Sequence, residues 1–392
     1  MHKNLLISLI LAGSLATPAL AGTPVAPVGA VYAMTNDTDA NAVLVFDRYA
    51  DGHLAYSNSY RTGGQGGVAV GPGDNDLGDP ADPLGSENSL ILDQDKSWLY
   101  AVNARSNTIS VFRVKPHGLE LKQIIYSGGN FPVSITTYQD LLYVLNSGND
   151  GNITGFSRAA SGLLTPIPHS TRSLTAGGTN PPNFIKSPAQ VSFDPSGRWL
   201  VVTLKGLNQI DLFKVENGLP AASPVENRSS GSTPFGFGFD AVGHLIVAEP
   251  FGPASPGVGG SGAVSSYEIG EYGTLTPISA TVLNYQTATC WIVLGPYGYF
   301  AYATNNVSNT ITGYSVNDGT IDLLDGTGVT AADVDRPSDM GVTTDGHYLY
   351  TLNAGSGTVT AHQINGATGA LTFIGDVAGL PVDDGAAGLA VR

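Results

Sequence analysis

A pair of short apolar segments joined by a polar turn recurs seven times along the chain, and this repeat limits the possible folds more than any other feature. LYAVNARSNTISVFRV and LYTLNAGSGTVTAHQI show the pattern, in which Val, Ile, Thr and Tyr favour β-strands. The copies begin at Val31, Leu99, Leu142, Leu200, Leu245, Ala301 and Leu349. A fold built from one repeated unit is therefore expected, with the period of about 40–50 residues that is typical of propeller blades.

The segments that flank each pair complete the unit. A strand-like segment ending in a polar or glycine turn precedes six of the pairs, and another strand-like segment follows each pair, as in GTLTPISATV. The preceding segments begin near Ser86, Phe131, Ser187, Thr233, Thr289 and Arg336, and a seventh copy, GAAGLAVR, ends the chain at Arg392. We therefore predict an all-β fold, a seven-bladed β-propeller with four strands per blade, in which the C-terminal strand joins the N-terminal blade and closes the ring.

Two separate β-sandwiches are the alternative for an all-β chain of 392 residues. A single hydrophobic core stops growing near roughly 250–300 residues, so a chain of this length forms either two domains or a repeat ring. Two sandwiches would not produce seven copies of one motif, and the ring is therefore favoured. Residues 22–392 are predicted to form this single domain.

The first 21 residues resemble a targeting segment. Lys3 supplies a positive charge, an apolar stretch runs from Leu5 to Ala16, and Ala19-Leu20-Ala21 forms a small-x-small cleavage site. The apolar stretch is too short to span a membrane, and no later segment reaches 18 apolar residues. We therefore predict a signal peptide over residues 1–21 and a soluble mature protein, exported to the periplasm or the extracellular space, that has no membrane span and is a monomer.

The charge and cysteine content exclude several classes of protein. The net charge is −15 with only 17 Lys and Arg, so the basic face of a nucleic-acid-binding protein is not expected. The one cysteine, Cys290, excludes an internal disulfide and a metal site built on a cysteine pair. Asp74, Asp76, Asp79 and Asp82 lie in one long stretch whose spacing matches no defined calcium loop, and an acidic surface loop is the alternative to a calcium site. No cofactor and no bound metal are predicted.

The order of the strands, A to D from the centre outward, places candidate side chains on one face of the ring. This face collects the connections from strand D to strand A, the starts of the A strands and the connections from strand B to strand C. Polar or aromatic residues expected near strand A starts are Glu87, Gln190, Trp291, Arg336 and Asp339. Those expected at or after strand B ends are Lys205, Glu249, Asn103, Asn146, Asn305 and Asn353. Such a set could polarise a carbonyl group or bind a carboxylate.

Each of these residues also has a structural interpretation. The recurring asparagines are typical of residues that cap a turn, and Trp291 could belong to the core. Glu249 departs from the asparagine pattern, which makes it a stronger candidate for function. Four of the histidines, His53, His117, His244 and His347, are expected in turns on the opposite face. No G-x-S-x-G or H-E-x-x-H motif is present, and Cys290 has no histidine predicted near it, which argues against a thiol nucleophile.

Several repeated phrases carry a family resemblance. SFDPSGRWLVVT, RSNTISVFRV, DGHYLYTLNAGSGTV and GTLTPIS resemble the lactonase family of seven-bladed propellers, which includes 6-phosphogluconolactonases and carboxymuconate lactonising enzymes, over about Val28 to Arg392. The resemblance implies a propeller fold and the opening or closing of lactones by a histidine near the start of an A strand, in a motif similar to S-P-H-x-H, together with Arg and Glu on neighbouring blades. The corresponding stretch here reads Ser187-Pro188-Ala189-Gln190, without histidine. We therefore expect any site to use other residues, such as Gln190, Lys205 and Glu249.

Three hypotheses for the function follow. In the first, an exported lactonase-like protein acts on a small lactone or a carboxylated sugar derivative in the central channel, with Lys205 or Arg336 polarising the carbonyl group and Glu249 acting as the base for water. In the second, a non-catalytic propeller binds a ligand, a glycan or a protein on the same face. The third is a structural protein of the cell envelope or surface, which is supported only by the predicted export and the acidic composition.

Overall fold

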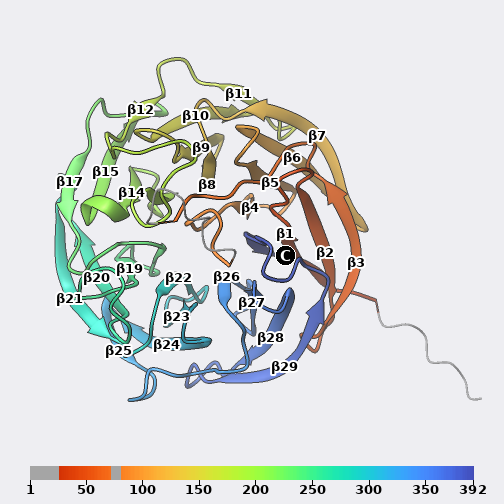
Figure 1. The fold of residues 1–392 in the computed structure, drawn as a ribbon, viewed down its shortest axis with the longest axis vertical. Helices are drawn as coiled ribbons and strands as arrows, with labels where there is room; N and C mark the ends of the chain where they lie inside the picture. The colour runs from red at the N-terminus through yellow and green to blue at the C-terminus, as the bar shows by residue number, and fades with distance from the viewer. Residues whose placement is uncertain (1–25, 72–80) are drawn as a thin grey trace, which may run out of the picture.

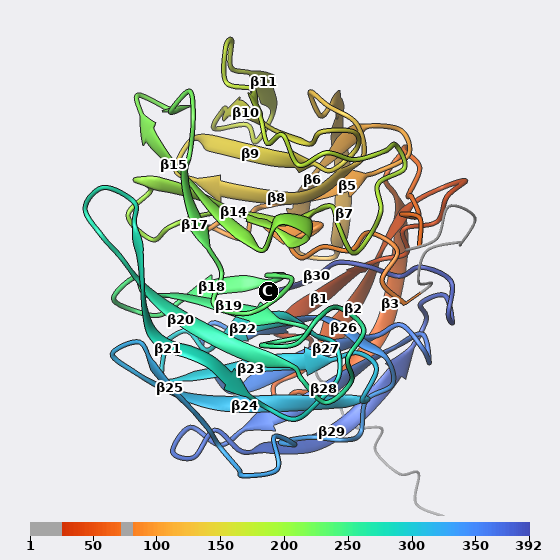
Figure 2. The same cartoon turned by 60° about the vertical axis from the view of Figure 1, so that its left-hand side comes forward.

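The computed structural model describes residues 26–71 and 81–392, and these residues form seven small antiparallel sheets arranged in a ring (Figures 1 and 2). The predicted signal peptide, residues 1–21, and the acidic residues Asp74, Asp76 and Asp79 lie outside the described residues. The all-β, seven-bladed prediction is confirmed, because each sheet has four strands along its main path.

The strands of each blade follow one another from the centre of the ring to its rim (Figure 1). Blade 1 contains β30 (Leu389–Val391), β1 (Gly29–Met34), β2 (Ala42–Arg48) and β3 (Leu54–Arg61). Blade 2 contains β4 (Leu90–Leu92), β5 (Trp98–Asn103), β6 (Thr108–Lys115) and β7 (Gly118–Tyr126). Blade 3 contains β8 (Pro132–Tyr138), β9 (Leu141–Asn146), β10 (Asn152–Arg158), β11 (Leu164–Pro166) and β12 (Arg172–Ser173).

The remaining four blades repeat this order. Blade 4 contains β13 (Pro188–Phe193), β14 (Trp199–Leu204), the 3-10 helix η1 (Lys205–Leu207), β15 (Gln209–Glu216), β16 (Leu219–Pro220) and β17 (Val225–Arg228). Blade 5 contains β18 (Phe237–Phe239), β19 (Leu245–Glu249), β20 (Ala263–Ile269) and β21 (Leu275–Leu283). Blade 6 contains β22 (Thr289–Leu294), β23 (Phe300–Asn305), β24 (Thr310–Asn317) and β25 (Thr320–Leu323). Blade 7 contains β26 (Pro337–Val342), β27 (Tyr348–Asn353), β28 (Thr358–Ile364) and β29 (Leu371–Ala378).

The ring is closed as the sequence predicts. The last strand, β30, pairs antiparallel with β1, with Val31 opposite Val391 and Ala33 opposite Leu389. In Figure 1 the C-terminus therefore lies near the centre, beside β1. Because the inner strand of blade 1 comes from the end of the chain, opening the ring requires the two ends of the domain to separate.

The second strand of each blade is buried on both faces, since each sheet packs between two neighbours. All six residues of β5 and of β14 are buried. Four of these strands carry a tyrosine whose hydroxyl donates to a glycine carbonyl in the outer turn of the next blade. Tyr100 donates to Gly162, Tyr143 to Gly218, Tyr302 to Gly369 and Tyr350 to Gly52, over 2.8–3.3 Å. The repeated Leu-Tyr or Ala-Tyr dipeptide in the sequence is therefore a contact between blades.

Within the described part of the chain, no helix is long and apolar enough to cross a membrane.

Candidate functional site

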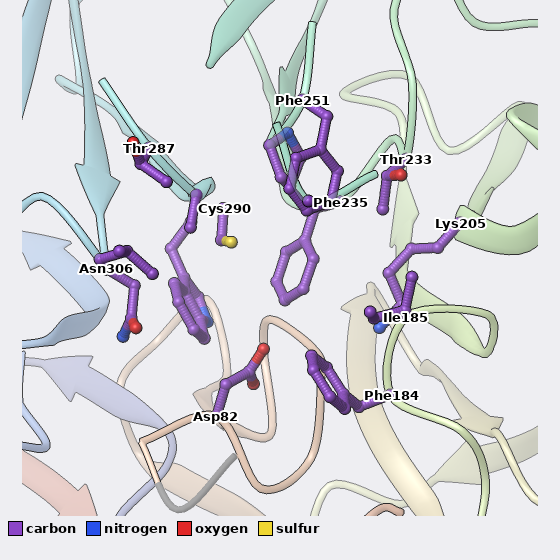
Figure 3. A pocket seen from close by; sticks show the side chains of 15 residues that line it. Asp82, Phe184, Ile185, Lys205, Thr233, Phe235, Phe251, Thr287, Cys290 and Asn306 are labelled. Carbon is purple, nitrogen blue, oxygen red and sulfur yellow. The ribbon is translucent and has the colours of Figure 1, made fainter. Parts of the chain in front are cut away.

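A cavity of about 320 Å³ opens on one face of the ring between the loops of blades 4, 5 and 6, and Asp82 reaches it from the connection between blades 1 and 2 (Figure 3). Its walls come from the connections that precede the inner strands and from those that follow the second strands. These connections lie on the face of the ring where the sequence predicts the site. A volume near 300 Å³ suits a small organic ligand. The residues that line the cavity are Asp82, Phe184, Ile185, Lys205, Thr233, Phe235, Pro250, Phe251, Gly257, Thr287, Ala288, Cys290, Trp291, Asn306 and Val307. We call this cavity the Lys205 pocket.

Lys205 is the buried cation of the pocket. It follows directly on the buried strand β14 and begins η1, a single 3-10 turn that ends at Asn208 in the left-handed region. This tight turn holds the lysine stem against the interior, where the residue is only 2% exposed. The Nζ atom donates a hydrogen bond to the carbonyl oxygen of Gly85 and lies 4.8 Å from the centre of the Phe235 ring. A cation over an aromatic face is attracted by the ring quadrupole.

Burial lowers the pKa of Lys205 to about 8, because the ammonium form loses its hydration. The charges of Asp82 and Cys290 oppose this effect. Both the ammonium form and the neutral amine of Lys205 are therefore populated at neutral to mildly alkaline pH. A lysine with this property in a cavity is a candidate for a functional group.

A short turn brings Asp82 to the pocket and holds Gly85, whose carbonyl accepts the hydrogen bond of Lys205. The Asp82 Oδ1 atom accepts a hydrogen bond from the Gly85 amide over 2.8 Å, while the Gly85 carbonyl accepts from Lys205. Gly85 has φ of +59°, and a Cβ atom there would lie 2.7 Å from the Nζ atom. Position 85 therefore favours glycine, for its backbone conformation and for the close approach of the lysine.

Aromatic side chains form much of the remaining wall. The indole of Trp291 meets the ring of Phe235 edge to face, with centroids 5.1 Å apart, and its Nε1 atom donates to the Ser86 carbonyl over 2.9 Å. Figure 3 shows Phe184 and Lys205 on one side, with Cys290 and Thr287 across the cavity from them and Asp82 at the bottom of the view. A ligand in the Lys205 pocket would thus meet one amine and one carboxylate on a surface that is otherwise mostly apolar, with Thr233, Thr287 and Asn306 as further polar side chains.

Two of the residues proposed from the sequence, Lys205 and Trp291, line this pocket. Glu249 does not. It is fully buried at the end of β19, where its carboxylate accepts from Ser229 Oγ, Ser265 Oγ, the Tyr267 hydroxyl and the Gly231 amide. Burial raises its pKa, although these four donors act in the opposite direction. Glu249 is not among the residues that line the cavity with Lys205, so the structure does not bring the two side chains together there.

The four asparagines at the ends of second strands occupy the same place in their blades as Glu249. Asn103 donates to Thr108 and Ser110 and accepts from Asn41 and Thr62, so it ties its own turn to the preceding blade. The equivalent residues Asn146, Asn305 and Asn353 also donate to side chains of the following strand or turn, and all four are buried. This geometry agrees with the turn-capping interpretation of these residues.

The other candidates lie at the inner strands or on the surface. Gln190 bridges two inner strands, because its amide donates to the Phe237 carbonyl and accepts from the Phe237 amide. Asp339 accepts from the amides of Met340 and Leu389 and so links blade 7 to the closing strand. Arg336 is partly exposed and pairs with Asp383 over 3.3 Å. Among the described residues, none of these lines the Lys205 pocket.

Glu87 and Asp339 form a buried acidic pair at the centre of the ring. Glu87 accepts from the Ile292 amide over 3.3 Å. Burial and the neighbouring charge of Asp339 raise the pKa of Glu87 well above its ordinary value, and burial raises the pKa of Asp339 to about 7. The two carboxyls titrate as a pair.

This pair makes stability depend on pH. Between about pH 4 and pH 7 this pair binds more protons in the folded protein than in the unfolded chain, so its contribution to the free energy of unfolding falls as the pH rises through this window. Replacing Glu87 with Gln removes one of the two charges. We therefore expect the free energy of unfolding to fall less between pH 5 and pH 8 in the variant than in the parent, by about 1–2 kcal/mol. Urea unfolding at both pH values measures this, with Glu268→Gln on the exposed side of β20 as control. An equal pH dependence in the variant and the parent would contradict the assignment.

Sequence reasoning missed Asp82, Phe184, Phe235 and Phe251 as parts of the pocket. Asp82 belongs to a stretch that the sequence presents as an acidic loop, yet it is only 8% exposed. The three phenylalanines stand in irregular segments between strands, where no periodicity marks them. The only sequence signal that could have identified these phenylalanines is that large hydrophobic residues stand in connections between predicted strands.

The model of the family described as lactonase, seven-bladed β-propeller, matches residues 85–179 and 260–382 of this chain. No curated protein matches the sequence. Among solved structures, a protein from Bacteroides fragilis provisionally assigned as a 6-phosphogluconolactonase shares 20% sequence identity, with a TM-score of 0.67 over 96% of this chain and 100% of that chain.

Two further structures show the same similarity. A protein from Bacteroides uniformis with the same provisional assignment shares 17% identity, with a TM-score of 0.69 over 93% of this chain and 99% of that chain. A periplasmic gluconolactonase from Pseudomonas aeruginosa shares 16% identity, with a TM-score of 0.65 over 93% of this chain and 98% of that chain. At these identities the similarity establishes the fold and not the substrate.

Proposed function

The chain belongs to the lactonase family of seven-bladed β-propellers, and we propose that it hydrolyses a small lactone in the Lys205 pocket. The observation that carries the proposal is a buried amine and a buried carboxylate, those of Lys205 and Asp82, in a cavity of about 320 Å³. Ester hydrolysis needs a group that stabilises the developing oxyanion and a group that accepts a proton from water, and these two side chains supply both.

In the proposed reaction the Lys205 ammonium donates a hydrogen bond to the carbonyl oxygen of the lactone. Charge accumulates on that oxygen as water attacks, and an ammonium group in apolar surroundings stabilises this charge more strongly than it would in bulk water. The Asp82 carboxylate accepts a proton from the attacking water. The ring oxygen leaves as a hydroxyl once it receives that proton, and the product is a hydroxy acid.

The character of the walls supports an uncharged lactone with an apolar body. Phe184, Phe235 and Trp291 offer ring faces and edges to a ligand. Asp82 would repel a strongly anionic substrate such as a phosphate ester, since its carboxylate stands near the lysine. A carboxylated sugar derivative is therefore the less favoured substrate at this pocket.

The test is acid release from a panel of aliphatic, aromatic and sugar lactones by the purified protein. We expect hydrolysis of at least one uncharged lactone and a loss of roughly 100-fold or more in kcat for Asp82→Asn, the range measured for removal of a general base. Glu249→Gln is the matched comparison, because Glu249 is the carboxylate that the sequence favours. If Glu249→Gln abolishes activity in a folded protein while Asp82→Asn does not, the base is assigned wrongly. A folded protein without activity on any lactone would favour the binding propeller.

We also propose that the protein is exported. The basic residue, apolar stretch and small-x-small site within residues 1–21 support this proposal. N-terminal sequencing of the protein recovered outside the cytoplasm would then begin near Gly22, whereas an intact Met1 would contradict it.

A further inference from the structure

Lys205 differs from an ordinary surface lysine in its surroundings. Its stem is enclosed by the turn of η1, and its Nζ atom reaches a cavity whose other residues are mostly apolar. That nitrogen contacts the carbonyl of Gly85 and the face of Phe235, and the charges of Asp82 and Cys290 also act on it. The contacts with Gly85 and Phe235 do not require a positive charge, because a neutral amine can also donate to a carbonyl oxygen and lie over an aromatic ring.

Burial therefore makes the neutral amine more abundant at Lys205 than at an exposed lysine, while the ammonium form still predominates at pH 7. Burial lowers the pKa of Lys205 to about 8, and Asp82 and Cys290, the titratable groups that face the amine across the pocket, keep it from falling further. At pH 7 a lysine with this pKa carries on the order of 100-fold more neutral amine than a lysine with the ordinary value near 10.4. A neutral amine is nucleophilic, and an ammonium group is not.

We propose that Lys205 is a carbonyl-reactive amine that forms an imine with a small, uncharged aldehyde or ketone bound in the Lys205 pocket. The proposal goes beyond lactone hydrolysis, because it gives the same pocket a covalent chemistry that does not depend on opening an ester.

The step is balanced without an oxidant or a reductant. The Lys205 nitrogen forms a bond to the carbonyl carbon, and the carbonyl oxygen takes up a proton to give a carbinolamine. The carbon–oxygen bond of the carbinolamine then breaks, and the oxygen leaves as water. This water carries both protons that the amine nitrogen has lost, and a carbon–nitrogen double bond remains. Asp82 stands close enough to the amine to affect its pKa and could transfer a proton between the nitrogen and the departing oxygen.

The pocket limits which carbonyl compounds are suitable. The cavity of about 320 Å³ admits a ring of the size of benzaldehyde, and the aromatic wall of Phe235 and Trp291 would pack against it. The carboxylate of Asp82 disfavours anionic carbonyl compounds such as keto acids. Benzaldehyde is therefore the probe that the structure selects.

The experiment traps the imine. The purified protein is incubated with benzaldehyde and cyanoborohydride, which reduces an imine to a stable benzyl amine, and the labelled lysines are identified by peptide mass spectrometry. We expect one benzyl group, on Lys205, at a rate on the order of tenfold or more above that of Lys186, which is exposed in a neighbouring loop. The rate at Lys205 should rise with pH and level off above about pH 8.

The controls separate this inference from the proposed function. Lys205→Met and Lys205→Arg should both lose the label while near-ultraviolet circular dichroism shows intact packing. Labelling of Lys186 and other exposed lysines at rates equal to that of Lys205, or no label on Lys205, would overturn the inference. Trapping is read by mass and needs no lactone, so a protein that is labelled at Lys205 but opens no lactone would refute the hydrolase and support the amine.

Discussion

Lys205→Met is expected to reduce kcat for lactone hydrolysis by about 100-fold or more at pH 7, comparable to the removal of an oxyanion donor. Methionine has nearly the length of the lysine stem and no charge, so the pocket keeps its shape while the carbonyl oxygen of the substrate loses its donor. The change also removes the hydrogen bond to Gly85. Steady-state kinetics on the best lactone of the panel, compared with the parent, give the measurement.

The pH profile provides a second reading of the same residue. The ammonium form is the donor in hydrolysis, so kcat of the parent should fall as the pH rises through about 8, where Lys205 loses its proton. Lys205→Arg keeps its charge at that pH, and any activity that it retains should not show this fall. Lys186→Met is the control, because its side chain is exposed. A folded Lys205→Met variant with unchanged kcat would remove the lysine from the reaction.

The fold is almost completely predictable from this sequence, for a physical reason. A blade buries its second strand on both faces, so apolar residues recur at the same places in each copy, and four of the seven copies also keep the tyrosine that reaches the next blade and the capping asparagine. The copies that begin at Leu99 and Leu349 differ in many positions, yet they keep Tyr100 and Tyr350 at the same place. The closing strand is predictable as well, because only one A-type segment is left for the first blade.

The site is much less predictable, because the connections that form it do not repeat. Lys205 and Asp82 come from loops of different blades, and only the closed ring brings them together. Glu249 illustrates the opposite difficulty. It departs from the asparagine pattern and therefore suggests function, whereas Ser229, Ser265 and Tyr267 supply donors for its carboxylate inside the blade. A residue that departs from a repeat can be accommodated by other residues that contact it in the folded blade. These contacts are not visible in a single sequence.

Removal of residues 389–392, which include the closing strand β30, is expected to cause the largest loss of stability. Leu389 and Val391 are 5% and 8% exposed and pack in one cluster with Val31, Phe46 and Tyr350. Losing a buried side chain of this size costs about 1.5–3 kcal/mol, and the truncation also removes the strand pairing with β1. We therefore expect a loss on the order of 5 kcal/mol, which is comparable to the whole stability of many domains. Thermal and urea unfolding measure the loss.

The consequence should go beyond a lower unfolding temperature. Without β30, the inner edge of β1 exposes backbone amides and carbonyls, and an exposed edge is a template for pairing with another chain. We therefore expect the truncated protein to aggregate on mild heating, as followed by light scattering, and a synthetic peptide GAAGLAVR to restore part of its stability by occupying the vacant place. Arg392→Ala is the control, because it keeps the strand and its backbone bonds to Ala30. A truncated protein that unfolds at the same temperature as the parent would show that the ring does not depend on this strand for its closure.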